Sequence, residues 1–125
     1  MDLAIATARL TRMTSAGTEP ILTADDLTAL LEQFSVVDSY GALPTDPDWD
    51  NSYNLTGAAA EGWLWKAGRV SNQFDFGSDV QRFSRNQLFA HCMKMHDEYA
   101  RRNAASLDVG GAYEDWAIIG NMNGL

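Results

Sequence analysis

The stretch from Ser52 to Phe74 constrains the fold more than any other part of the sequence. Read as a helix, it places one set of apolar residues within an arc of about 120°, at about 100° per residue: Leu55, Ala59, Trp63, Ala67, Val70 and Phe74. Trp63, Leu64 and Trp65 are consecutive, so they point in three directions, and such a helix must be covered on more than one side. We therefore expect a central helix in which these three residues lie in the core or at a subunit interface. Because the two indoles are about 200° apart, one should lie at a subunit boundary or under residues 75–83.

Three other residues of this stretch do not fit a simple apolar helix. Lys66 lies inside the apolar arc, so its ammonium group must either extend to solvent or meet a carboxylate. Gly62 and Gly68 each lower helix propensity by about 1 kcal/mol relative to alanine. The close approach of a neighbouring helix would explain why glycine occupies these positions.

Residues 23–35 have the clearest signal for another helix. The Thr23 hydroxyl can cap the first turn, and Asp26 can complete a capping box. Apolar residues then follow on one narrow face: Leu27, Leu30, Leu31 and Phe34. Residues 2–13 have a similar face, but a helix of about a dozen residues is marginal alone. Residues 1–20 are therefore either a docked short helix or an arm that orders on a partner.

Ser84 is predicted to open the last helix, over residues 84–103. Ser84 and Gln87 fit a capping box, and an apolar face follows: Leu88, Cys92, Met95 and Tyr99. Residues 75–83 would connect this helix to the central one as a short hairpin or a loop. Together the patterns predict an all-α fold, a small bundle of three to four helices within residues 21–105.

The C-terminal segment, residues 106–125, has a different composition. It contains four glycines and no helical period, yet it keeps bulky apolar residues that disordered tails lack: Tyr113, Trp116, Ile118 and Ile119. We expect an extended tail that docks through these side chains on a partner. Packing back onto its own domain is the alternative.

Bulk composition limits the classes of function. The chain has 125 residues, 46% of them hydrophobic, which suits a single domain with one core. Nine basic against seventeen acidic residues argue against binding nucleic acid through phosphates. The single cysteine, Cys92, favours a reducing cytosol. No stretch approaches the roughly 18 apolar residues of a membrane span, and the N-terminus does not have the pattern of a secretory signal.

The acidic residues Asp46, Asp48 and Asp50 have the spacing that opens an EF-hand calcium loop. The rest of that motif is missing, because Asn51 stands where a glycine is needed and Gly57 where a bidentate glutamate is needed. A solvated turn within the long loop of residues 38–53 is the better interpretation.

A metal site or a Cys–His nucleophile at His91, Cys92 and His96 is not supported by their spacing. On one helix the two histidines are about 140° apart and Cys92 faces the core, so they do not converge. We interpret His96 as a hydrogen-bonded residue at the edge of the core, and Cys92 as a small core residue. The sequence predicts neither a metal, nor a cofactor, nor an enzyme.

Two stretches resemble a known family. The first is LTADDLTALLEQF, and the second runs from Asp46 to Arg102 with the motifs DPxW, LxxAAAxGW, KAGxV, FDF, SRxQ and YARR. In these residues the chain resembles the small head-to-tail connector (adaptor) proteins of long-tailed bacteriophages.

The resemblance implies a mainly helical subunit that forms a homo-oligomeric, dodecameric ring beneath the portal protein of the capsid. Such a ring extends the DNA channel, lets DNA pass without sequence-specific binding, and offers a surface to the head-tail stopper or tail proteins. The C-terminal residues, Val109–Leu125 here, would reach the portal. The protein would then be made in the host cytoplasm and reside in the neck of the virion, away from membranes. Its acidic charge suits a channel wall that repels phosphate.

A different class of protein also fits the residues. A stand-alone acidic helical module that binds other proteins, such as a regulator or an inhibitor, would explain the charge and the apolar tail equally well. It would not explain the resemblance.

Overall fold

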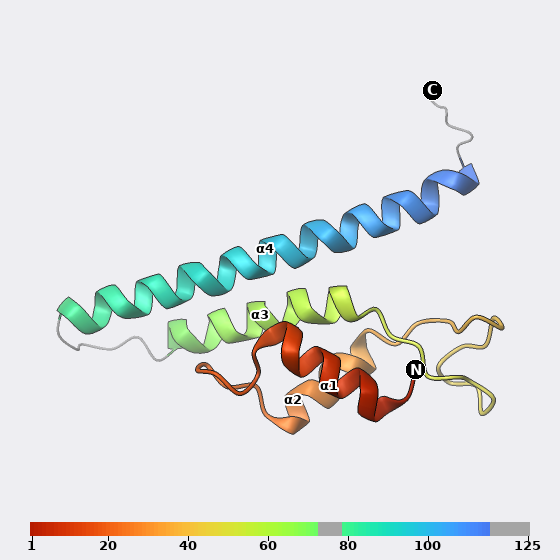
Figure 1. Ribbon diagram of the computed structural model, residues 1–125, viewed down its shortest axis with the longest axis horizontal. Helices are drawn as coiled ribbons and strands as arrows, with labels where there is room; N and C mark the ends of the chain where they lie inside the picture. The colour runs from red at the N-terminus through yellow and green to blue at the C-terminus, as the bar shows by residue number, and fades with distance from the viewer. Residues whose placement is uncertain (73–78, 116–125) are drawn as a thin grey trace.

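The computed structural model describes residues 1–72 and 79–115, with side chains for residues 1–71 and 84–105. The described part of the chain forms four helices: α1 (Leu3–Thr14), α2 (Ala24–Gln33), α3 (Leu55–Asn72) and α4 (Asp79–Asp115). α3 lies in the middle, with α1 and α2 on one side and α4 on the other (Figure 1). The predictions of a small all-α bundle and of a central helix are confirmed.

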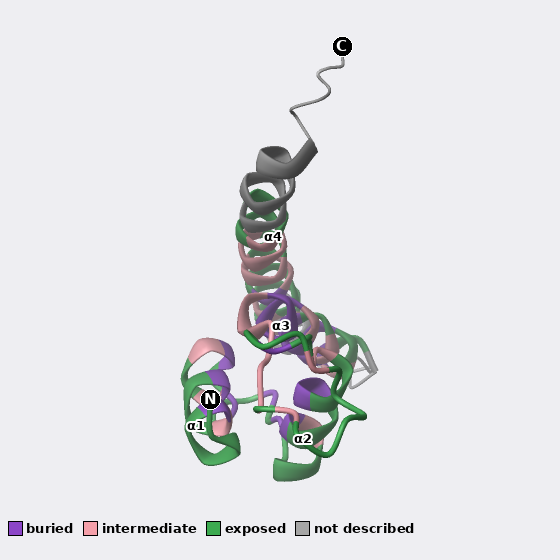
Figure 2. Ribbon diagram, turned by 90° about the vertical axis from the view of Figure 1, so that its right-hand side faces the viewer, coloured by how far each residue is buried: buried purple, intermediate pink, exposed green. Residues whose placement is uncertain are grey.

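The main core lies between α1, α2 and the first half of α3 (Figure 2). Its buried residues are Ala6, Leu10, Ala16, Leu22, Leu27, Leu30, Leu31, Ala58 and Ala59. The small residues of α3 allow this close packing. A Cβ atom built on Gly62 would lie 2.9 Å from Thr14 Cγ2 and 3.3 Å from Leu30 Cδ1. The prediction of a close neighbour is therefore confirmed for Gly62, but it is wrong for Gly68, whose Cβ would meet nothing within 4 Å.

α2 begins as the sequence predicts, and its start is tied to α3. Thr23 Oγ1 accepts a hydrogen bond from the Asp26 amide, and the Asp26 carboxylate accepts one from the Thr23 amide, which completes the capping box. The same carboxylate forms a bidentate ion pair with the Arg69 guanidinium, at 2.7 and 3.0 Å. The hydrogen bonds from Arg69 hold the pKa of Asp26 well below its usual value.

α4 begins earlier than predicted. Residues 79–83 are helical rather than part of a hairpin or loop, so Ser84 lies inside the helix and does not cap it. The Ser84–Gln87 pattern was misleading because a capping box is a local signature that also occurs inside helices. Residues 73–78, with Phe74, lie outside the described residues.

α4 also ends later than predicted. Residues 106–115 continue the helix to Asp115, so the expected change to an extended tail after residue 105 is wrong for these residues. Gly110 and Gly111 each cost only about 1 kcal/mol in a helix interior, and adding residues to a formed helix is far easier than starting one. Residues 116–125, with Trp116, Ile118 and Ile119, lie outside the described residues.

The predicted long loop lies between α2 and α3. An isolated antiparallel bridge joins Ser35 to Tyr53, and its flanks are held by hydrogen bonds from Val36 N to Ser52 O and from Asn54 N to Phe34 O, both 2.9 Å. The two ends of the loop are therefore held together next to the helical bundle. Its acidic residues, Asp46, Asp48 and Asp50, are exposed, as expected for a solvated turn.

Candidate functional site

The three consecutive apolar residues of α3 lie in different environments. Trp63 is buried, with 4% of its surface exposed, and packs with Ala67 and Cys92. Trp65 is half-buried on the other side of the helix, where its indole N–H donates to Glu61 Oε2 at 3.0 Å. Leu64 is 38% exposed between them. The two indoles thus contact different parts of the molecule, and Leu64 is left on the surface.

Lys66 neither extends to solvent nor meets a carboxylate, so that prediction is wrong. Its residue is only 1% exposed, and its ammonium donates to Thr14 O and Ser15 O at 2.7 Å each. These carbonyls lie at the C-terminal end of α1, where helix carbonyls have no partner within the helix and the helix dipole is negative. The ammonium also lies 4.4 Å from the centre of the Trp63 ring. Burial lowers the pKa of Lys66.

The histidines and the cysteine of α4 contribute to packing. His96 Nδ1 lies 2.8 Å from Ala60 O, and the His91 ring meets the Trp63 ring edge to face at 5.5 Å. The prediction that His96 is hydrogen-bonded at the edge of the core is confirmed. Cys92 is fully buried, and burial raises the pKa of its thiol. Among the described residues, His, Cys, Asp and Glu side chains do not gather into a group that could hold a metal ion.

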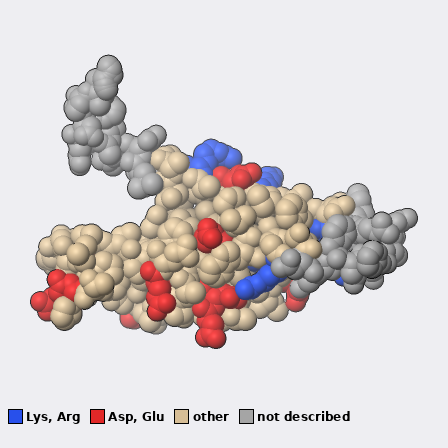
Figure 3. Space-filling view, turned by 180° about the vertical axis from the view of Figure 1, so that it is seen from behind, with Lys and Arg blue, Asp and Glu red and all other residues tan. Residues whose placement is uncertain are grey.

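Charge is distributed unevenly over the molecule. Between Arg12 and Lys66 the sequence has no Lys or Arg, while it has nine Asp and Glu residues. Figure 3 shows acidic side chains spread over the side of α2 and the long loop, with basic side chains both on the α4 side and lower down beside the acidic ones. The α4 cluster is mixed, because Glu98 lies 4.0 Å from Arg102.

A groove opens where the start of α1, the end of α2 and the long loop meet; we call it the loop-end groove. Its volume is about 380 Å³, and it is lined by Leu3, Thr28, Leu31, Glu32, Ser35, Pro44, Thr45, Trp49 and Tyr53. Trp49 and Tyr53 form an edge-to-face aromatic pair with ring centres 5.7 Å apart. Burial raises the pKa of Tyr53, and the nearby charges of Asp2 and Glu32 raise it further.

A single buried carboxylate organises the loop beside this groove. Asp38 Oδ1 accepts hydrogen bonds from the amides of Tyr40 and Ala42, and Oδ2 accepts one from the amide of Asp50, all at 2.8 Å. These bonds lower the pKa of Asp38, the bond from Asp50 most of all. The Trp49 indole N–H donates to Val36 O at 2.9 Å, which fixes Trp49 against the residue that follows the Ser35–Tyr53 bridge.

The far end of α4 extends beyond its neighbour. Asn54 Nδ2, just before α3, donates to Asn103 Oδ1 at 2.9 Å, so at this point α4 reaches the start of α3. The helix then continues over residues 104–115, about 18 Å at about 1.5 Å per residue. Figure 1 shows this end projecting past the bundle. The predicted docking residues follow there: the backbone of Tyr113 is in the projecting helix, and the other three lie beyond the described residues.

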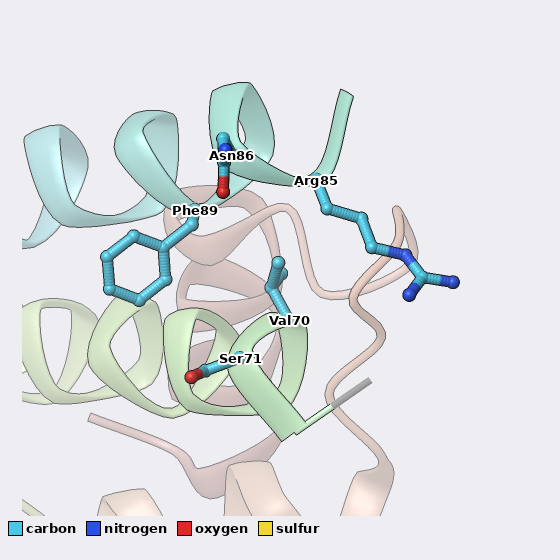
Figure 4. A pocket seen from close by; sticks show the side chains of 5 residues that line it. All are labelled: Val70, Ser71, Arg85, Asn86 and Phe89. Atoms are coloured by element: carbon cyan, nitrogen blue, oxygen red, sulfur yellow. The ribbon is translucent and has the colours of Figure 1, made fainter. Parts of the chain in front are cut away.

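A smaller pocket of about 200 Å³ lies between the C-terminal end of α3 and the N-terminal part of α4 (Figure 4). Phe89 and Asn86 of α4 face Val70 and Ser71 of α3, and the Arg85 side chain extends to one side. Phe89 is 40% exposed, so this pocket adds apolar surface near Leu64 on the same pair of helices.

The loop-end groove is the feature that the sequence analysis missed. Its lining residues lie between positions 3 and 53, and their apolar members belong to three segments that have no shared period. One sequence signal does point to this region, namely the absence of Lys and Arg between Arg12 and Lys66, together with exposed apolar residues in the loop.

Comparison with known proteins assigns no family to the chain. No protein-family model matches the chain, and no characterised protein or solved structure is similar enough to count as a match. Among the described helices, none combines the length and the apolar character needed to cross a membrane.

Proposed function

We propose that the protein is a head-to-tail adaptor of a long-tailed bacteriophage, a structural subunit that forms a dodecameric ring beneath the capsid portal. In this role it would extend the DNA channel and present a surface to the stopper or tail proteins. DNA would pass through the ring without sequence-specific binding, and the protein would act as a virion component and not as an enzyme.

The observation that carries the proposal is the projecting end of α4. A helix of 37 residues is twice as long as the 18-residue helix on which it packs, and residues 104–115 extend past that partner. Residues that do not contact their own domain do little for its stability, whereas they can contact another molecule. The apolar residues after Asp115 would follow from this end, which suits docking on the portal.

Two further observations support a role in assembly. Several of the motifs on which the resemblance rests lie in helices of the bundle, such as the LxxAAAxGW stretch that forms the first half of α3. The acidic charge of α2 and the long loop suits a wall past which DNA must move, because carboxylates repel phosphates. Neither the acidic nor the apolar surface requires a catalytic group.

The test is assembly with the cognate portal protein. The purified chain is mixed with portal particles, and electron microscopy with image averaging should show an added ring of subunits coaxial with the portal channel. Virions should contain the protein in the neck. A chain that neither decorates the portal nor copurifies with virions would contradict the proposal.

A stand-alone acidic binding module remains the second candidate, because the loop-end groove gives such a protein a place to bind a partner. This candidate predicts a tight complex of defined stoichiometry with one soluble protein, and it predicts no ring on the portal. The portal experiment therefore separates the two.

A further inference from the structure

We propose that the loop-end groove is a docking site for a partner-protein segment that combines bulky apolar side chains with Lys or Arg. This inference does not depend on the adaptor role, and it concerns a surface formed by α1, α2 and the long loop. It is carried by the exposed apolar groups around the groove, by the fixed geometry of its walls and by its charge.

Exposed apolar residues line and flank the groove. Leu3 in its lining is 45% exposed, and further exposed residues flank it in the sequence: Val36, Val37, Tyr40 and Leu43. Tyr40 is 87% exposed, on a loop that is otherwise held firmly. Apolar side chains gathered in this way on a small protein mark interaction surfaces, and aromatic residues are favoured at their centres.

The walls of the groove are formed before any partner binds. Trp49 is fixed by its hydrogen bond to Val36 O and by the Tyr53 ring, and the Ser35–Tyr53 bridge holds the base of the loop. Asp38 fixes the turn through three backbone amides. Rigid walls reduce the entropy lost on binding, so a modest contact area can give useful affinity.

The charge of the groove favours a cationic partner, although the Met1 ammonium also lies beside it and donates to Asn51 O. Glu32 is the only charged residue in its described lining, and Asp2 lies close enough to act on Tyr53. The exposed Asp46, Asp48 and Asp50 belong to the same loop. A basic side chain at the rim would pair with these carboxylates while apolar neighbours fill the groove, and such complementarity also speeds association.

A second copy of the chain offers exposed apolar and basic side chains together on a folded helix, as with Ile5, Arg9 and Arg12 of α1. The outer face of α4 presents Lys94 and Arg101 beside Asp97, and its exposed apolar residues there are alanines, Ala90 and Ala104. Residues 106–125 carry three acidic residues and no basic one, so the groove repels them. We take the occupant to be a segment of a different protein, and a second copy is the outcome that a test of self-association detects.

Binding of synthetic probe peptides to the full chain tests the inference. The first probe is an eight-residue peptide of Leu, Phe and Lys; the second has Glu in place of Lys, and the third has Ser in place of Leu and Phe. Nitrogen-15 NMR of the protein follows each titration. The first probe should bind at least about tenfold more tightly than either of the others, and its shifts should centre on the Trp49 indole and the Glu32 amide.

Two pairs of variants locate the site. Glu32→Lys should weaken binding of the first probe by about tenfold, whereas Asp25→Lys, which makes the same charge change on an exposed residue of α2, should not. Leu3→Ser should weaken binding several-fold, and Ile5→Ser, on another face of α1, should not. All four positions are exposed, so circular dichroism should show intact folds.

Several outcomes would overturn the inference. One is equal affinity of the first and third probes, because binding would then depend on charge alone and not on the apolar side chains. Another is an equal loss of binding in Glu32→Lys and Asp25→Lys. A third is tighter binding by a peptide of residues 106–125, or self-association that Leu3→Ser abolishes, because the occupant would then be a second copy. None of these results bears on ring formation at the portal.

Discussion

The two sides of α3 are covered in different ways. On the α1–α2 side, α3 presents Gly62, alanines and two long polar groups that reach the end of α1: Lys66 donates to Thr14 O and Ser15 O, and the Trp63 indole donates to Met13 O at 3.0 Å. On the α4 side, larger side chains interlock around Cys92, with hydrogen bonds at Ala60 and Asn54. The first side is closely packed and tied by specific bonds, and the second is a longer apolar seam.

The difference shows which parts of the chain belong to the fold. α1 is not a free arm, because α3 satisfies the carbonyls at its end and buries Ala6 and Leu10 completely. α4, in contrast, is longer than the seam that it forms. The N-terminal helix is therefore a structural part of the domain, and the far end of α4 is available for assembly.

The largest expected effect separates the two tryptophans of α3. Trp63→Ala should lower the free energy of unfolding by about 3–5 kcal/mol, because it empties the centre of the α4 seam and removes the bond to Met13 O. Trp65→Ala should cost about 1 kcal/mol, since this side chain is half-buried. Urea unfolding followed by circular dichroism measures both. Similar losses for the two variants would mean that the half-buried indole contributes as much to stability as the buried one.

The next effect tests the tie between α3 and α1. Lys66→Met keeps much of the aliphatic stem but takes the ammonium donor from the buried Thr14 carbonyl and leaves Ser15 O with the Thr18 amide alone, so it should destabilise the protein by about 1–3 kcal/mol. Lys94→Met, on the exposed face of α4, serves as the control and should change stability by less than about 0.5 kcal/mol. If Lys66→Met were as stable as the parent, the ammonium would not anchor α1.

The glycines of α3 should respond to alanine with opposite signs. Gly68→Ala adds a methyl group to open space and gains helix propensity, so it should stabilise the protein by about 0.5–1 kcal/mol. Gly62→Ala gains the same propensity but places a methyl group 2.9 Å from Thr14 Cγ2, and strain of about 1–3 kcal/mol should outweigh the gain. Thermal unfolding of the two variants provides the comparison. Stabilisation by both would show that α1 can move away from α3.

A smaller, pH-dependent effect is expected at the start of α2. The pKa of Asp26 is lower in the folded than in the unfolded state, so its ionised form stabilises the fold above the usual value of about 3.8. That contribution disappears as the pH falls below this value towards the folded pKa. Asp26→Asn should therefore cost about 1 kcal/mol at neutral pH, and the difference from the parent should shrink in acid. A difference that is independent of pH would contradict the assigned ion pair.

Local signals in the sequence identified most of the bundle. The capping box at Thr23 and Asp26 located the start of α2 because all its bonds are within one turn. The apolar arc of residues 55–70 identified α3 because the helical period is a property of the backbone. The cost of glycine in a helix marked Gly62 and Gly68 alike as positions of close approach, which is correct for Gly62 alone.

What the sequence could not predict depends on contacts between distant segments. Gly68 has the same propensity as Gly62, so only the surroundings distinguish them. The partner of Lys66 is the end of another helix, about fifty residues away, which no spacing rule reveals. The ends of α4 were misplaced for a different reason, because capping and glycine signals are weak against the extension of an already long helix. The loop-end groove combines three segments and has no local pattern.

Removal of residues 109–125 tests the assembly role most directly. The deletion shortens the projecting end of α4 and removes Tyr113, Trp116, Ile118 and Ile119, but it leaves the contacts between α3 and α4 up to Asn103 intact. The truncated chain should unfold within a few degrees of the full chain, and it should no longer form a ring on portal particles in electron micrographs. A truncated protein that still decorates the portal, or one that unfolds, would contradict the account.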